Sequence, residues 1–202
     1  MARNMEQNEK IREERKKQIQ SAALRLFATK GLFATKIKDI AEAVGIAQGL
    51  IYHYYKSKED IYVELIKDAL NKMNEAVFSL KKMPQPPHVK IRTALEELLH
   101  VIENSEDFIQ TCRLIAQASN STAIPESAKK LIEEMRDIPY QEIARIMGDG
   151  QKEGTIIEAD PQDLALIFWT SINGLAMYKA SRTNRVKMPD VCLLINIFLK
   201  EE

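Results

Sequence analysis

The sequence has 202 residues, enough to bury a sizeable core without disulfide or metal staples, and its 29 basic and 29 acidic side chains cancel. Its two cysteines, Cys112 and Cys192, lie far apart in apolar stretches, a spacing that excludes a metal or redox motif and favours a reduced, cytoplasmic protein. We expect no signal peptide, because the N-terminus is charged, and no membrane span, because every apolar run is too short.

The charges are unevenly divided along the chain. Residues 1–58 contain 12 Lys and Arg against 6 Asp and Glu, whereas residues 59–202 contain 17 against 23. A basic head on an acidic body is typical of a protein whose N-terminal end binds a polyanion such as DNA. A chance excess of charge on a solvated helix is the alternative.

Apolar residues recur at helical spacing, and glycine and proline cluster between the segments, so the sequence predicts an all-α fold of about nine helices. We expect Gly31 to end the first helix, Thr35 to cap the second, and Ser57 with Asp60 to cap the fourth. Pro139 is expected to kink the seventh. The predicted helices cover residues 10–30, 36–44, 48–54, 58–82, 89–103, 107–119, 125 to about 150, 161–180 and 189–199.

Residues 35–54 have the pattern of a helix-turn-helix. Two short amphipathic helices are separated by Gly45, and apolar positions from Ile37 to Ile51 hold them together. In this motif the second helix enters the major groove of DNA, which is wide enough to admit one helix. Any small three-helix bundle can show the same spacing, so spacing alone leaves that alternative open.

Two segments, AALRLFATKG (residues 22–31) and IKDIAEAVGIAQGLIYHYYKSKEDI (residues 37–61), closely resemble the signature of the TetR family of repressors. The match extends over about residues 15–62. The resemblance implies a helix-turn-helix DNA-binding domain in residues 1–57. It also implies a larger helical domain for ligand binding and dimerisation in residues 58–202, where the family has no shared motif.

The resemblance also implies which side chains meet DNA. The positions that face base edges are Gln48, Gly49, Leu50 and Tyr54, and those that contact phosphate are Thr35, Lys36, Tyr52 and Lys58. His53, on the same helix, is expected to reach phosphate as well. A glutamine can pair bidentately with adenine, and a lysine or phenol can donate to phosphate. Two positions depart from the family pattern, since Ala47 replaces a usual hydroxyl and Leu50 a frequent small polar residue.

The predicted helix over residues 161–180 is apolar on more than one face. One face can pack in its own domain while the other, where Gly174 allows close approach, packs against a second chain. The helix over residues 189–199 adds another apolar stripe, formed by Val191, Leu194, Ile195 and Phe198. Paired across a two-fold axis, the two helices would form a homodimer seam; an ordinary core helix is the alternative.

A pocket for a small-molecule effector is expected among the helices of the body. The candidates are aromatic, adaptable or polar residues on otherwise apolar helices: His100, Phe108, Cys112, Met135, Tyr140, Met147, Trp169 and Asn173. Core packing is the alternative for each of them. The three histidines are too scattered to bind a metal, and we expect no cofactor.

The sequence therefore predicts a homodimeric transcriptional regulator, most simply a repressor that binds a palindromic operator and releases it when a small molecule binds the body. A DNA-binding nucleoid-associated or structural protein without a ligand is the alternative. We expect no catalytic activity, because the sequence shows no nucleophile–base pair, metal spacing or phosphate-binding loop. The operator, the effector and the direction of the response stay open.

Overall fold

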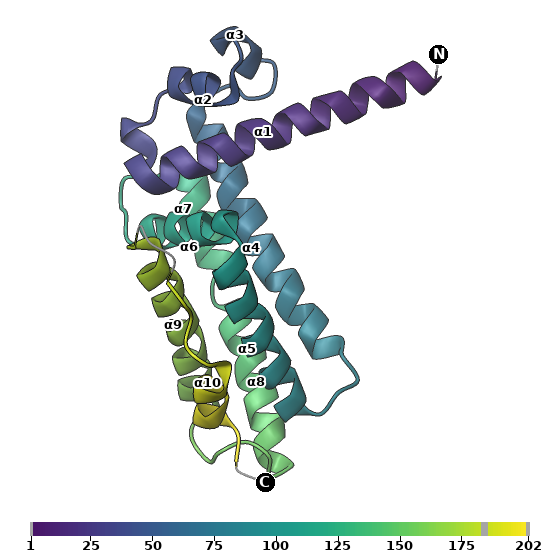
Figure 1. Ribbon diagram of the computed structural model, residues 1–202, viewed down its shortest axis with the longest axis vertical. Helices are drawn as coiled ribbons and strands as arrows, with labels where there is room; N and C mark the ends of the chain where they lie inside the picture. The colour runs from purple at the N-terminus through teal and green to yellow at the C-terminus, as the bar shows by residue number, and fades with distance from the viewer. Residues whose placement is uncertain (1, 183–185, 201–202) are drawn as a thin grey trace.

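The computed structural model describes residues 2–182 and 186–200, and the regular secondary structure in these ranges is helical (Figure 1). The all-α prediction is confirmed. The chain forms α1 (Ala2–Ala34), α2 (Ile37–Val44), α3 (Gln48–Ile51), α4 (Lys58–Lys82), α5 (Pro87–Asn104), α6 (Glu106–Ser119), α7 (Glu126–Met135), α8 (Ile138–Lys152), α9 (Pro161–Ala180) and α10 (Val191–Phe198). Among the helices so described, none is both long and apolar enough to cross a membrane.

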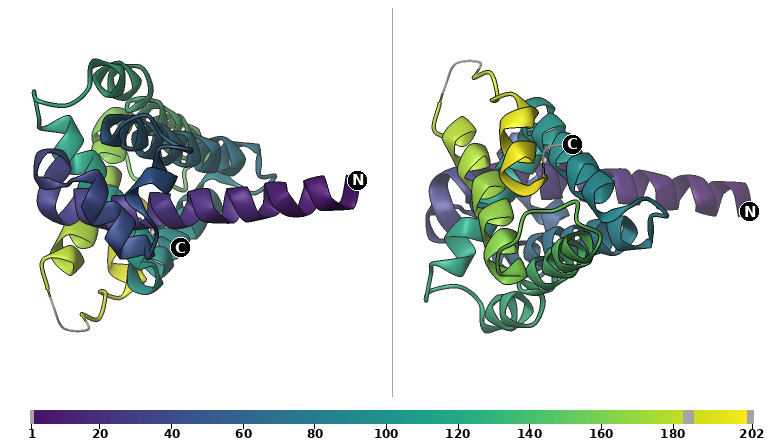
Figure 2. Two further views of the ribbon diagram at one scale, coloured as in Figure 1. Left: turned by 90° about the horizontal axis from the view of Figure 1, so that it is seen from above. Right: turned by 90° about the horizontal axis from the view of Figure 1, so that it is seen from below.

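A small head sits on an elongated body. α1 lies across one end of the body with α2 and α3 on its far side, so α3 is at the extremity of the molecule (Figure 1). The N-terminal part of α1 projects away from the other helices, as the two end-on views show (Figure 2). α4, α5, α8 and α9 run along the body, and α10 packs on α5 near the end farthest from α3.

The head is not packed as a separate unit, because its hydrophobic core continues into the body. This core joins α1, α2 and α3 to the first half of α4 and to α6 and α7. At its centre the fully buried Phe27 contacts Tyr62 of α4 edge-on, with the ring centroids 5.5 Å apart. Gln117 of α6 also donates from Nε2 to the carbonyl oxygen of Ala28 at 2.9 Å. The boundary between residues 57 and 58 falls at the start of α4 and stays a prediction.

Local signals end α2 and begin α4 where we expected. The Ser57 hydroxyl accepts a hydrogen bond from the backbone N–H of Asp60 at 3.1 Å and caps α4. Gly45 closes α2 with φ 73°, and Gly31 interrupts α1 with φ 81°, a left-handed conformation that costs glycine little. Contrary to expectation, the helix resumes after Gly31 and continues to Ala34.

Two predicted helix features are wrong. Lys36, not Thr35, is the N-cap of α2, because the Thr35 hydroxyl donates to the carbonyl oxygen of Gly31 at 2.8 Å instead. The single kinked helix after residue 125 is two helices, α7 and α8, which are separated at residues 136–137. Pro139 lies in the first turn of α8, where its missing N–H is tolerated, so it helps to begin a helix rather than kink one.

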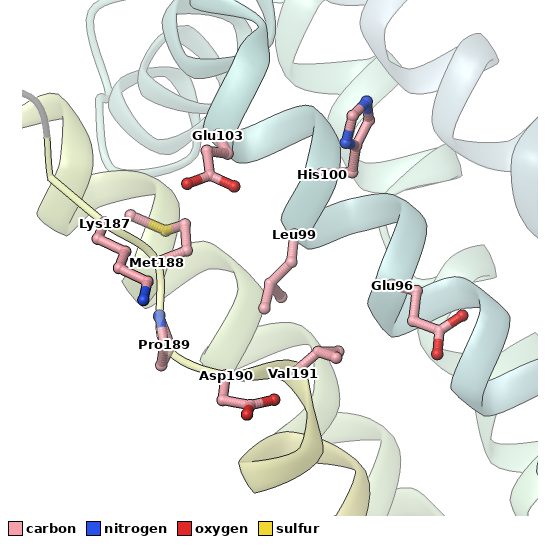
Figure 3. Close-up of a pocket in the computed structure, with 9 residues that line it drawn as sticks. All are labelled: Glu96, Leu99, His100, Glu103, Lys187, Met188, Pro189, Asp190 and Val191. Carbon is pink, nitrogen blue, oxygen red and sulfur yellow. The ribbon is translucent and has the colours of Figure 1, made fainter.

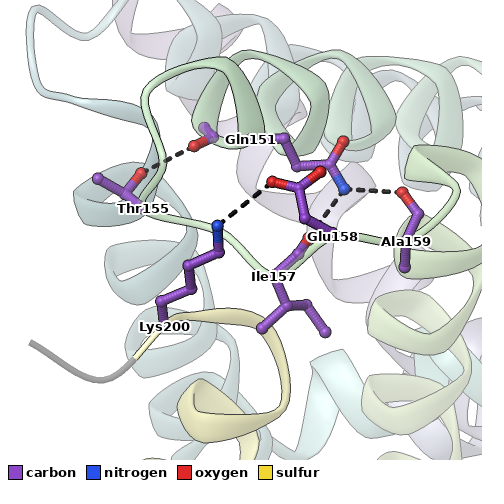
Figure 4. Close-up of polar contacts among 7 residues, drawn as sticks. Gln151, Thr155, Ile157, Glu158, Ala159 and Lys200 are labelled. Atoms are coloured by element: carbon purple, nitrogen blue, oxygen red, sulfur yellow. Dashed lines mark hydrogen bonds and ion pairs between the residues drawn. The ribbon is translucent and has the colours of Figure 1, made fainter.

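The far end of the body is closed by polar contacts around the turn between α8 and α9 (Figure 4). Gln151 donates from Nε2 to the carbonyl oxygens of Ile157 and Ala159, at 2.8 and 2.7 Å. Lys200, just after α10, forms an ion pair with Glu158 at 3.2 Å. The end of α10 is tied to this turn by the backbone, since the N–H of Ile157 donates to the carbonyl oxygen of Phe198 at 3.0 Å.

Candidate nucleic-acid interface and ligand hollows

The exposed end of the head carries most of the predicted DNA-contacting positions. Gln48 and Gly49 are exposed and Leu50 is partly so, while the fully buried Ile51 anchors α3 to the head core. The side chains of Tyr52 and His53 follow in the turn after α3 and are also exposed. Tyr54 is half-buried and packs against the head core. The structure thus brings residues 48–50 and 52–54 together at one end of the molecule.

The start of α2 gives the two predicted phosphate positions different roles. Thr35 is fully buried, and its hydroxyl is used by the bond to Gly31, so its side chain serves the fold of the turn. Lys36 is exposed, and its backbone N–H donates to the Asp39 carboxylate at 3.0 Å. Of this pair, the Lys36 side chain is therefore the one placed to reach an external phosphate.

Lys58 has a structural task that the sequence did not indicate. Its ammonium group donates to the carbonyl oxygens of Leu32, Phe33 and Thr35, at 2.8, 3.2 and 2.9 Å. The carbonyls of Leu32 and Phe33 are among those that the end of α1 would otherwise leave without an intrahelical partner. Lys58 thereby joins the first residue of α4 to the end of α1 and to the residue before the N-cap of α2.

Replacing Lys58 with methionine is expected to destabilise the protein by about 1–3 kcal/mol, since three carbonyl oxygens lose a charged donor. Urea unfolding followed by circular dichroism measures the free energy of unfolding. The matched control is Lys56→Met, which removes the same charge from an exposed neighbour. Equal stabilities of the two variants would show that the Lys58 contacts contribute nothing.

A hollow of about 790 Å³ lies where the head meets the body, and we call it the α1 hollow. Helices α1, α4, α5 and α6 form its walls, with Trp169 of α9 at its inner side. Its apolar wall is formed by Leu24, Leu65, Ala69, Leu70, Met73, Ala76, Leu98, Val101, Phe108, Cys112, Ile115 and Trp169. Its volume is in the range of small-molecule sites in proteins.

A second hollow of about 700 Å³, the α9 hollow, lies between α4, α6, α7, α8 and α9. It is lined by Leu70, Met73, Ile115, Ala116, Ser119, Ile132, Arg136, Asp137, Tyr140, Gln141, Gln162, Leu166, Trp169 and Asn173. Four of these residues, Leu70, Met73, Ile115 and Trp169, also line the α1 hollow. The two hollows therefore adjoin, and we call these four shared residues the partition.

The predicted ligand residues divide among several places. Phe108 and Cys112 line the α1 hollow, Tyr140 and Asn173 the α9 hollow, and Trp169 both. The other three do not join them. His100 is exposed on α5 beside a different hollow, which the segment 187–191 covers (Figure 3), whereas Met147 is fully buried in the body core and Met135 packs against the head core.

Sequence reasoning missed the contribution of α1 to the α1 hollow. Lys17, Gln20, Ser21 and Leu24 line it from the head side. These residues follow an ordinary helical pattern, and only the crossing of α1 over α4 and α6 turns them toward a cavity. Nothing in their spacing could have distinguished them from a helix face packed on a core.

The Cys112 thiol is kept protonated by its surroundings. Burial disfavours the thiolate and raises the pKa of Cys112 to about 11. At pH 8 it is therefore expected to react with iodoacetamide at least about a hundredfold more slowly than a cysteine of ordinary pKa. Mass spectrometry of a Cys192→Ser variant, which retains Cys112 alone, measures this rate, with glutathione as the reference thiol. A rate equal to that of glutathione would contradict the burial of Cys112.

α9 and α10 both carry large apolar side chains that are exposed, and we call these side chains together the seam surface. Its residues are Leu166, Ile167 and Tyr178 of α9 and Leu193 and Ile197 of α10. The two helices lie side by side in both Figure 1 and Figure 2. Two of the stripe residues expected to face a second chain, Ile195 and Phe198, are instead buried in the body core. The neighbouring positions on α10 face outward in their place.

Metal chemistry finds no support in the described part of the chain, where no group of three or more His, Cys, Asp or Glu side chains is arranged to hold an ion. In Figure 3 the side chains of Glu96, His100 and Glu103 point in different directions from α5.

Comparison with known proteins agrees with this geometry. Residues 19–65 match the model of a family described as bacterial regulatory proteins, tetR family. The HTH-type transcriptional regulator RutR of Escherichia coli K12 is 27% identical over 158 residues, which are 78% of this chain and 71% of RutR.

Two solved structures show the same fold. A putative fatty acid metabolism regulator of Clostridium perfringens has a TM-score of 0.69 and 22% identity, over 89% of this chain and 93% of that one. AibR, in complex with isovaleryl coenzyme A and operator DNA, has a TM-score of 0.69 and 17% identity, over 90% of this chain and 94% of that one. The matched family model and the exposed helix-turn-helix identify residues 19–65 as a tetR-family DNA-binding domain, and with the likeness to RutR they identify the chain as a DNA-binding transcriptional regulator.

Proposed function

We propose that this regulator is a homodimeric repressor that leaves its operator when a small molecule occupies the α1 hollow. The observation that carries this proposal is that the hollow has walls from both the head and the body: Leu24 belongs to α1, and Phe108 and Cys112 to α6. A molecule bound there contacts the helix that carries the DNA-reading end. Occupancy of the body can therefore change the position of the head.

The DNA contacts follow from the exposed end of the head. Gln48, Gly49 and Leu50 of α3 read base edges in the major groove, and Tyr54 contributes from its exposed edge. Lys36, Tyr52 and His53 contact phosphates, which hold the head in register on the duplex. Thr35 and Lys58 act mainly by shaping the turn that precedes α2, since their polar atoms are engaged within the protein.

The seam surface joins two copies. An exposed apolar surface that spans two helices is typical of a protein interface, and a two-fold axis lets the same surface serve both copies. In such a dimer the two α3 helices face the same side and read successive major grooves, about 34–36 Å apart, of a palindromic operator.

Release of DNA needs only a difference in ligand affinity between two arrangements of the head. α1 is held on α4 by an ion pair between Lys16 and Glu64 at 2.7 Å, and the Lys16 ammonium lies 5.9 Å from the Tyr55 ring centroid. Lys17, next to this contact, lines the α1 hollow. A ligand that widens the hollow shifts α1 against α4 and so alters the spacing of the two heads; a coupling of about 1–3 kcal/mol is typical of such systems.

The structural neighbours support an effector that carries an acyl group. One is described as a regulator of fatty acid metabolism, and another is bound to both isovaleryl coenzyme A and operator DNA. Both share the fold of this chain, and the AibR structure shows that the fold can accommodate an acyl compound.

Fluorescence anisotropy tests the proposal with DNA from upstream of the protein's own gene and a scrambled fragment of equal length. Preference for the native fragment by about a thousandfold or more is expected of a specific operator. Equal and steeply salt-dependent binding would favour a nucleoid-associated protein instead. The operator complex is then titrated with 2-octanone and with octanoate, and persistence of the complex at saturating ligand would refute ligand-driven release.

A further inference from the structure

Trp169 lies at the partition between the two hollows. It is 7% exposed, it lines both hollows, and its ring contacts that of Tyr140 with the centroids 6.0 Å apart. Its indole N–H is buried, and within the described residues it has no hydrogen-bond partner. A buried donor left without an acceptor is costly, so this N–H favours any occupant that brings an acceptor to it.

The partition between the two hollows includes a side chain that can change its conformation. Leu70 is almost fully buried, but Met73 is only half-buried, and methionine is the most adaptable apolar side chain. Rotation of the Met73 side chain away from Trp169 would make the α1 and α9 hollows continuous. The combined space suits an elongated molecule better than a compact one.

The charges around the hollows limit what can enter. In the α1 hollow Lys17, Lys72 and Asp107 are exposed and Asp68 is half-buried, while most of the other lining side chains are apolar. In the α9 hollow Arg136 pairs with Asp137 at 3.4 Å, and both are exposed. A charge carried deep into either hollow would lose its hydration without gaining a partner, which is strongly unfavourable. The buried portion of the occupant must therefore be uncharged.

We propose that the effector is an elongated, uncharged apolar molecule whose carbonyl or equivalent acceptor binds the Trp169 indole N–H while its chain fills the α1 hollow. That this molecule regulates DNA binding rests on the proposed function, but its binding to the hollow can be measured without DNA. Ketones, esters, amides and thioesters of medium-length chains belong to this class. A free carboxylate and a small polar ring do not, since the partition offers them a single donor.

Isothermal titration calorimetry of the DNA-free protein tests the proposal with 2-octanone and with 1-chloroheptane, a chain of similar size that lacks a strong acceptor. Trp169→Phe is expected to weaken 2-octanone binding about tenfold and to leave 1-chloroheptane binding within about twofold. In the unsubstituted protein octanoate is expected to bind more weakly than 2-octanone. Equal effects of the substitution on both neutral probes would overturn the proposal.

A second measurement covers the case in which Trp169→Phe does not fold. The chain has one tryptophan, so its fluorescence reports on Trp169 alone. In the intact protein 2-octanone should shift the emission maximum to longer wavelength, as a hydrogen-bonded indole does, and 1-chloroheptane should not. The same shift with both probes, or with neither, would overturn the proposal. If the ketone binds as expected but leaves the operator complex intact, the ligand class stands and ligand-driven release fails.

Discussion

A Leu193→Glu/Ile197→Glu variant is expected to be monomeric and to bind the operator at least about a hundredfold more weakly than the unsubstituted protein. Leu193 and Ile197 are 64% and 41% exposed on the seam surface, so the substitutions leave the body core intact. In a dimer they would bury four carboxylates in an apolar contact, which association cannot tolerate. The monomer then loses the gain from binding two half-sites at once, a factor of about 10²–10⁴.

Sedimentation velocity gives the mass of this variant, and anisotropy on the operator gives its affinity. The matched control is Gln85→Glu/Thr122→Glu, which adds the same two charges at exposed loop positions outside α9 and α10. The seam surface is ruled out as the interface if the variant keeps the mass of a dimer. A monomer that binds the operator as tightly as the control would instead show that one head is enough for operator binding.

Features set by local chemistry could be predicted from the sequence. Gly45 ends α2 and Ser57 caps α4 because each acts on backbone groups within a few residues. The prediction that Thr35 caps α2 is wrong because its hydroxyl can either accept from an N–H of α2 or donate to the carbonyl oxygen of Gly31. Only the turn after Gly31 decides between these two hydrogen bonds. Lys58 is different again, since its carbonyl partners lie more than twenty residues away. Its role depends on how α4 meets the end of α1.

The same distinction between local features and features set by helix packing applies to the surfaces of the body. The sequence indicates that α9 is apolar on two faces, but which residues face outward depends on how α9 packs against α6 and α8. Trp169 and Tyr140 could be named as candidates from their chemistry, whereas Leu24 could not, because its place at a cavity arises from the crossing of α1 over the body. A pocket between helices is a tertiary feature, and periodicity reports only that a face is apolar.

Gln48→Ala is expected to reduce the preference for the cognate operator over a site with one changed base pair by about 5–100-fold, with little loss of affinity for random DNA. Gln48 is exposed at the start of α3, where its amide can pair with an adenine edge. Loss of such a pair costs about 1–3 kcal/mol of discrimination against the wrong base. Tyr52→Phe should behave differently. It removes only the hydroxyl of an exposed tyrosine next to α3, so a phosphate contact would be lost equally on every sequence.

The two variants form a matched pair because both alter exposed side chains at the same end of the head and leave the buried Ile51 in place. Anisotropy titrations on the operator, on single-base-pair variants of it and on a scrambled fragment distinguish their effects. If Gln48→Ala weakens binding to all of these fragments by the same factor, it contacts the backbone and α3 is not oriented with its first residue toward the bases. If Tyr52→Phe changes the ranking of the fragments, its hydroxyl reads a base, and the base-reading surface extends beyond α3 into the turn that follows it.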